Sequence, residues 1–115
     1  MLGYTSYMGT IKILKQSEFA KEVLESKVPT VVDFYADWCG PCRAMTPVLE
    51  RAQAELGGKV NIVKINVDDS EELAYKYKVM SIPTIVIING GEEVERTIGM
   101  LSDQALVDKV NSIIG

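Results

Sequence analysis

The feature of this sequence that most constrains its fold is an apolar segment that runs directly into a helical pattern, with two cysteines at the junction. Residues 30–36 are β-branched or apolar with a single charged interruption, which is typical of a strand buried on both faces of a parallel sheet. From residue 41 to residue 56 the apolar positions recur at helical spacing, and two glycines follow as a stop signal. Cys39 and Cys42 lie between these segments. The sequence therefore predicts a buried strand, a short turn that carries both cysteines, and a long helix that begins at them.

The rest of the chain completes the pattern of an α/β fold in one domain. With 115 residues, 47% of them apolar, the chain is large enough to bury a core without crosslinks. We expect residues 1–9 to be a flexible leader and residues 10–115 to fold in the order β-α-β-α-β-α-β-β-α, with helices on both faces of a mixed sheet. The turn signal Asn89-Gly90-Gly91 predicts that the last two strands form an antiparallel hairpin. The expected strands are 10–14, 30–36, 60–67, 84–88 and 93–98, and the expected helices are 17–25 with Ser17 as its cap, 41–56, 71–77 and a last helix capped by Ser102.

Charge and hydropathy exclude several classes of function. The net charge of -4 provides no basic face for phosphates, so we expect neither nucleic acid nor an anionic membrane surface as a partner. No segment approaches the roughly 18 apolar residues of a membrane span, and the first ten residues lack the basic start and the apolar stretch of a signal peptide. We therefore expect a cytoplasmic protein. In that reducing compartment, a bridge between cysteines separated by only two residues closes almost no loop, so the pair indicates chemistry rather than a structural crosslink.

The cysteine pair matches half of a zinc site, but the sequence has no histidine and no third cysteine to complete one, so we expect no metal. The same spacing brings both sulfurs to one side of the first helical turn, where they can bond to each other. Unpaired N–H groups and the positive end of the helix dipole favour a thiolate at Cys39, which we interpret as the nucleophile. Cys42, one turn further in, is then the resolving thiol. Pro41 suits the first helical position, where no N–H is needed.

Three more residues stand where they could act on the cysteines. Asp33 interrupts the buried strand, where a carboxylate is costly unless its pKa rises or a partner compensates it. It could accept a proton from Cys42, directly or through a water, or it could be an ordinary carboxylate at an exposed strand end. Lys64, in the neighbouring strand, could modulate Asp33 or belong to a solvated face. Pro83 precedes a strand that should be central, where it fits if the bond before it is cis, and the alternative is a trans proline that ends the loop.

Residues 34–42, Phe-Tyr-Ala-Asp-Trp-Cys-Gly-Pro-Cys, resemble the active-site segment of the thioredoxin family. Asp33 is similar to the buried aspartate of that family, Pro47 to its helix-kinking proline, and the segments 64–68, 77–84 and 98–99 to its third strand, its cis-proline loop and its glycine loop. The resemblance covers nearly all of the chain from residue 10. It implies a five-stranded mixed sheet flanked by four helices, with strand order 1-3-2-4-5. Tyr35 departs from the family pattern, which often has tryptophan there, and the leader is longer than the family core.

The resemblance also implies a function. The protein would be a protein-disulfide reductase without a cofactor that takes electrons from a thioredoxin reductase. It would act as a monomer on targets such as peroxiredoxins, ribonucleotide reductase and methionine sulfoxide reductases. Cys39, Cys42 and Asp33 would carry the chemistry, and Lys64 would modulate it. An extended substrate segment, held beside Cys39 by the Ile82 backbone, would occupy a shallow apolar groove formed by Trp38, Gly40, Pro41, Ile82, Pro83, Gly99 and Met100.

Two other functions remain open at this point. Related folds use the same cysteine pair to oxidise or isomerise disulfides, although Gly40-Pro41 resembles the reducing members, and a redox titration separates the two. A thioredoxin fold can also serve as a binding subunit through its groove, although the intact cysteines argue against that as the only role.

Overall fold

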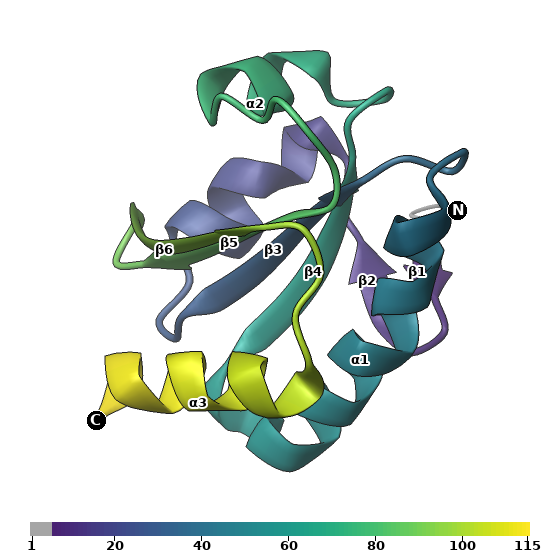
Figure 1. Ribbon diagram of the computed structural model, residues 1–115. Coiled ribbons are helices and arrows are strands. Elements are labelled where there is room, and N and C mark those ends of the chain that lie inside the picture. The colour runs from purple at the N-terminus through teal and green to yellow at the C-terminus, as the bar shows by residue number, and fades with distance from the viewer. Residues whose placement is uncertain (1–5) are drawn as a thin grey trace.

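The centre of the molecule is a six-stranded mixed sheet (Figure 1). The computed structural model describes residues 6–115. Its strands are β1 (Ser6–Met8), β2 (Ile11–Ile13), β3 (Thr30–Tyr35), β4 (Asn61–Asn66), β5 (Thr84–Asn89) and β6 (Glu92–Ile98). In space they follow the order β1-β2-β4-β3-β5-β6. β4 is parallel to β2 and β3, whereas β5 is antiparallel to β3 and β6. The expected α/β fold class is confirmed, and the strands from β2 to β6 have the expected order 1-3-2-4-5.

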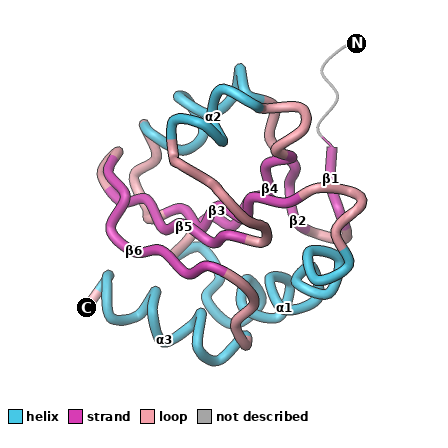
Figure 2. Tube along the Cα trace, turned by 45° about the horizontal axis from the view of Figure 1, so that its top comes forward, coloured by secondary structure: helices cyan, strands magenta, loops and turns pink. Residues whose placement is uncertain are grey.

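Helices cover both faces of the sheet, with α1 and α3 on one face and α2 on the other (Figure 2). They are η1 (Gln16–Glu18), η2 (Ala20–Leu24), α1 (Gly40–Leu56), η3 (Gly57–Lys59), α2 (Glu71–Lys76) and α3 (Asp103–Ile114). Ser102 caps α3 as expected, since its hydroxyl oxygen accepts from the backbone N–H of Ala105 at 3.1 Å. In residues 6–115 no helix is long and apolar enough to cross a membrane.

The helix expected at 17–25 begins earlier and is irregular. It consists of η1, a 3-10 turn, followed by η2, a π-helix. Ser17 does not cap it; instead the backbone N–H of Lys15 donates to the carboxylate of Glu18 at 2.9 Å. A glutamate side chain can accept a hydrogen bond from the backbone N–H three residues before it, and this contact between Glu18 and Lys15 starts the turn before Ser17.

Alternate residues of the strands supply two cores, one on each face of the sheet. The core under α1 and α3 includes Val31, Ile62, Ile85, Met45, Leu49 and Leu106. The core on the other face includes Val32, Phe34, Ile65, Phe19, Val23 and Leu73. Asp33 and Lys64 follow Val31 and Ile62 by two residues, so their side chains lie on the α1 face.

The sixth strand, β1, corrects the expected number of five. It pairs antiparallel with β2 through a turn at Gly9, whose φ of 62° is a conformation that glycine adopts readily. The turn is fastened to α1 by Glu50, whose carboxylate accepts from the backbone N–H of Thr10 at 3.0 Å. Three residues are too few for a readable alternation, so this strand is defined by its pairing and not by its sequence. Residues 1–5 of the expected leader lie outside the described residues.

Candidate active site

Both cysteines lie at the first turn of α1, just after the loop that follows β3. Cys39 is the N-cap residue, and the backbone N–H of Cys42 donates to its sulfur at 3.2 Å. The two sulfurs form a disulfide, with the Cα atoms 5.2 Å apart. Because α1 begins at Gly40, Pro41 is the second helical residue and not the expected first. This shift costs the helix no hydrogen bond, since the first four N–H groups of a helix have no partner within it.

The two sulfurs have different environments at the N-terminus of α1. Cys39 Sγ accepts a backbone hydrogen bond there, whereas Cys42 belongs to the first turn and is 0% exposed. Cys39 is 5% exposed, so it is the outer member of the pair. After reduction, the N–H of Cys42 and the positive end of the helix stabilise negative charge on Cys39.

A loop with a cis peptide bond lies beside the cysteines. The bond between Ile82 and Pro83 is cis, as the resemblance implies. Cys39 Sγ lies 3.9 Å from the carbonyl oxygen of Ile82. The backbone N–H of Gly99 donates to the carbonyl oxygen of Pro83 at 2.8 Å and thereby ties the loop after β6 to the same place. A chain segment that approaches Cys39 therefore meets the Ile82 backbone.

A shallow, mainly apolar groove of about 420 Å³ opens next to this loop. Trp38 forms part of its wall and is 69% exposed, and its indole N–H donates to the carboxylate of Asp68 at 2.9 Å, which fixes the ring. Met80, another part of the wall, is 92% exposed. The lining residues are Trp38, Val67, Val79, Met80, Ser81 and Ile82.

Of the seven residues expected to form the groove, Trp38 and Ile82 line it. The others lie outside its lining: Gly40 and Pro41 are exposed at the start of α1, Gly99 and Met100 follow β6, and Pro83 is buried next to Ile82 in the chain. Val67, Val79, Met80 and Ser81 were not predicted from the sequence. Their only signal is position, at the end of β4 and in the loop before the cis proline.

Asp33 and Lys64 form an ion pair in the interior on the α1 face. Lys64 Nζ lies 3.0 Å from Asp33 Oδ2, and the relative exposure of both side chains is 0%. The alternatives of an exposed carboxylate and a solvated lysine are therefore wrong. Desolvation raises the pKa of Asp33 to about 6, although the charge and the hydrogen bond of Lys64 act in the opposite direction. Asp33 can thus exchange a proton close to neutral pH.

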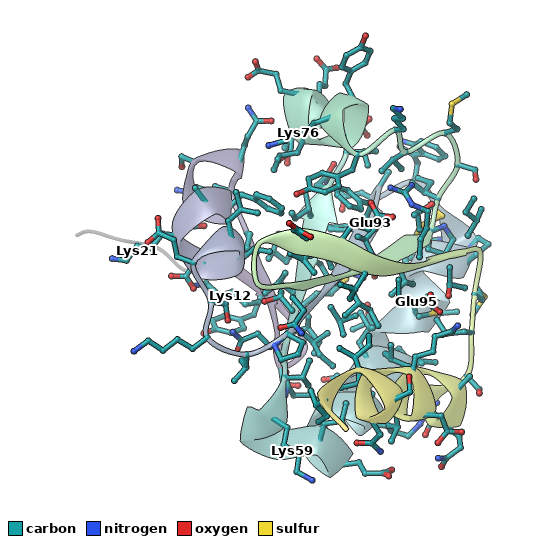
Figure 3. The ribbon with its side chains drawn as sticks, turned by 90° about the vertical axis from the view of Figure 1, so that its left-hand side faces the viewer. Lys12, Lys21, Lys59, Lys76, Glu93 and Glu95 are labelled. Carbon is teal, nitrogen blue, oxygen red and sulfur yellow. A yellow bond between two sulfur atoms is a disulfide. The ribbon has the colours of Figure 1, made fainter. Side chains whose placement is uncertain are left out.

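Lys64 differs from the lysines at the surface. Lys21, Lys59 and Lys76 come from three separate elements and are exposed (Figure 3). Lys64 Nζ instead donates to the hydroxyl oxygen of Thr46 at 3.1 Å and lies 4.5 Å from the centre of the Tyr35 ring. Thr46 was not predicted from the sequence, where its only signal is that of a polar residue one helical turn after Cys42. No three His, Cys, Asp or Glu side chains come together as metal ligands within residues 6–115.

Comparison with known proteins identifies the family of this chain. Residues 10–112 match the family model described as Thioredoxin. The thioredoxin of Bacillus subtilis (strain 168) is 46% identical over 90% of this chain and 97% of that protein. The thioredoxin of Rickettsia felis is 43% identical over 85% of this chain and 93% of its own length, and that of Streptomyces clavuligerus is 46% identical over 86% and 92%. The chain therefore belongs to the thioredoxin family and is a thiol-disulfide oxidoreductase that reduces disulfides of other proteins by cycling Cys39 and Cys42 between dithiol and disulfide.

Proposed function

We propose that Cys39 makes the first attack on a target disulfide and that Cys42 resolves the product. The Cys39 thiolate attacks one sulfur of the target, the target S–S bond breaks, and the other target sulfur leaves as a thiolate. Cys42 then loses its proton and attacks Cys39 Sγ, so that the mixed disulfide breaks and the second target sulfur leaves as a thiolate. The target gains two electrons, and the protein keeps the Cys39–Cys42 disulfide. The observation that carries this assignment is the hydrogen bond from the Cys42 N–H to Cys39 Sγ, because it stabilises negative charge on Cys39.

In this proposal Asp33 accepts the proton of Cys42. Its Oδ1 has no hydrogen-bond partner among the described residues, so that oxygen is available to a proton donor or to a bridging water. With a pKa of about 6, the carboxylate is mostly ionised at neutral pH and is still basic enough to take a proton. Lys64 modulates this basicity through its contact with Oδ2 at 3.0 Å.

The substrate segment lies in the groove in an extended conformation beside the Ile82 backbone. The carbonyl oxygen of Ile82 is 3.9 Å from Cys39 Sγ, so a backbone N–H of the segment can pair with it while the neighbouring disulfide contacts Cys39. The residues proposed to contact the substrate are Trp38, Gly40, Pro41, Ile82, Pro83, Gly99 and Met100.

Membership of the family implies disulfide-containing proteins as substrates and a thioredoxin reductase as the source of electrons. We propose peroxiredoxins, ribonucleotide reductase and methionine sulfoxide reductases as target classes. The protein would act as a monomer in the cytoplasm, where dithiols are kept reduced. Its functional domain would be residues 10–115, to which residues 6–8 of the expected leader add the strand β1.

Trapping of targets tests these assignments. Cys42→Ser keeps the nucleophile but removes the resolving thiol, so mixed disulfides with target proteins should accumulate and should be released by dithiothreitol. Cys39→Ser is the matched control and should accumulate few adducts. If Cys39→Ser forms the adducts instead, the nucleophile has been assigned to the wrong cysteine. Mass spectrometry of the released proteins tests the three target classes. A redox titration against glutathione tests whether the protein reduces or oxidises the disulfides of its targets, since a reductase keeps its own disulfide in buffers that reduce the disulfide of an oxidase.

A further inference from the structure

Lys64 is fully buried, and its ammonium group meets partners in three directions. Its Nζ donates to Asp33 Oδ2 at 3.0 Å and to Thr46 Oγ1 at 3.1 Å. The face of the Tyr35 ring, 4.5 Å away at its centre, occupies the third side. An ammonium group has three donors and no acceptor, so these contacts are what keeps a charged lysine tolerable without water.

Thr46 connects this lysine to the helix that carries the cysteines. It lies four residues after Cys42 in α1, which places both side chains on the same face of the helix. Because an ammonium group only donates, the Thr46 oxygen must present a lone pair to Lys64 and direct its own proton elsewhere. That proton is donated to the thioether sulfur of Met8 in β1 at 3.3 Å. Met8 therefore fixes the rotation of the hydroxyl that Lys64 needs.

We propose that Thr46 is a positioning residue for the resolving step, because its hydroxyl shares the Lys64 ammonium with Asp33 and thereby limits how tightly the lysine binds the carboxylate. The inference rests on the proposed role of Asp33 as the proton acceptor. Met8 supports Thr46 from β1, so the strand beyond the expected five contributes to the same hydrogen-bonded series.

Because Thr46 and Asp33 share the Lys64 ammonium, removal of the Thr46 hydroxyl should lower the pKa of Asp33. Lys64 is the charged group that acts on the Asp33 carboxyl, the Tyr35 ring of β3 lies against the same ammonium group, and Cys42 lies one turn before Thr46. Without the Thr46 hydroxyl, Asp33 is the remaining hydrogen-bond acceptor of the ammonium. The pair then tightens and the carboxylate form is favoured, so Asp33 becomes a weaker base.

Titration of the Asp33 side-chain carboxyl carbon by NMR in the disulfide form tests this inference without measuring activity. Thr46→Val removes the hydroxyl and keeps the shape, and it should lower the pKa of Asp33 from about 6 by roughly half a unit or more. Thr46→Ser keeps the hydroxyl and should titrate like the wild type. Met8→Leu removes only the acceptor of the Thr46 proton and should give a smaller shift in the same direction. Thr46→Ala serves as a second variant if the valine disturbs the packing.

The pH dependence of resolution provides the functional readout. In stopped-flow measurements, the acidic limb of the profile should move to lower pH in Thr46→Val and return to the wild-type position in Thr46→Ser. An unchanged or raised Asp33 pKa in both Thr46→Val and Thr46→Ala, or equal shifts in the valine and serine variants, overturns the inference. The proposed function fails separately, if Asp33→Asn leaves the rate of resolution unchanged. If Asp33→Asn slows resolution while Thr46→Val moves neither readout, only the role of Thr46 is wrong.

Discussion

Asp33 of β3 lies directly opposite Lys64 of β4 in the parallel register, and their side chains meet at 3.0 Å where no solvent reaches. The ion pair does not fully offset the loss of hydration of the Asp33 carboxylate. Desolvation outweighs the attraction of the lysine, so the pKa of Asp33 rises to about 6 despite the ion pair. The fold thus keeps an ionisable group where a neutral residue would be more stable, next to the helix that carries both cysteines.

Asp33 should make the folded protein less stable as the pH rises. The folded state holds the Asp33 proton with a pKa of about 6, against an ordinary value of 3.8, so the stabilising contribution is complete below the ordinary value and is lost as the pH rises through 6. At 1.36 kcal/mol per pKa unit, the free energy of unfolding should fall by about 3 kcal/mol from this group between about pH 4 and about pH 7. Asp33→Asn should lack this fall and be more stable than the wild type at neutral pH. Denaturant melts across this pH range measure the difference, with the exposed Asp37→Asn as the control. Parallel profiles for wild type and Asp33→Asn would contradict the raised pKa.

The same substitution should separate the two chemical steps. Deprotonation of Cys42 is required only after the mixed disulfide has formed, so Asp33→Asn should slow resolution while leaving the first attack by Cys39 nearly unchanged. Loss of a general base typically slows a step by about 100-fold or more. Stopped-flow reduction of a model disulfide resolves both steps. A comparable slowing of both steps would mean that Asp33 acts on the whole site and not on the Cys42 proton.

Position and burial of Asp33 and Lys64 show how far the sequence can predict this site. A charged residue inside an apolar strand and a lysine in the next strand are visible as interruptions of a pattern. Whether they face each other depends on the register of β3 against β4, which is set by packing over the whole sheet. The residue pattern left an exposed aspartate and a trans proline open as alternatives, and the resemblance to a family favoured the buried aspartate and the cis proline.

Other features could not be predicted because they arise from tertiary contacts. β1 is held by pairing with β2 and by the contact of Thr10 with Glu50. Neither contact produces a recognisable pattern in the sequence of a three-residue segment. Met80 lines the groove because of where its loop passes, and an isolated methionine in a loop has no functional signature. Thr46 carries no signal beyond its spacing from Cys42, since its role depends on the lysine that reaches it from β4.

In the reduced protein, Cys39 alone should react with alkylating agents near neutral pH. Its sulfur accepts the Cys42 N–H and lies at the positive end of α1, whereas Cys42 is fully buried. Peptide mapping after limited treatment with iodoacetamide locates the label, and the denatured protein, in which both thiols are accessible, is the control. Equal labelling of both cysteines in the folded protein would remove the basis for separate roles.

Met80→Glu should weaken binding of protein substrates without affecting the chemistry of the cysteines. The substitution places a charge in the wall of the apolar groove, so KM for a protein disulfide should rise, while the rate with a small aromatic disulfide should stay near that of the wild type. Tyr75→Glu is the matched control, because Tyr75 is also an exposed apolar residue, at 87%, but lies in α2 outside this groove. A rise in KM of the same size in both variants would indicate a general effect of negative charge and not a groove contact.

The short strand β1 also changes what the sheet offers to other chains. Among the described residues, β1 pairs with β2 over three residues, and a border of that length is a poor template for a further strand. The opposite border, β6, carries the charged residues Glu92, Glu93, Glu95 and Arg96, and its pairing with β5 is irregular at Ile87 and Ile88. Charges and irregularities at a border oppose the addition of foreign strands. Both borders of the sheet therefore oppose the edge-to-edge pairing with other chains that would seed aggregation.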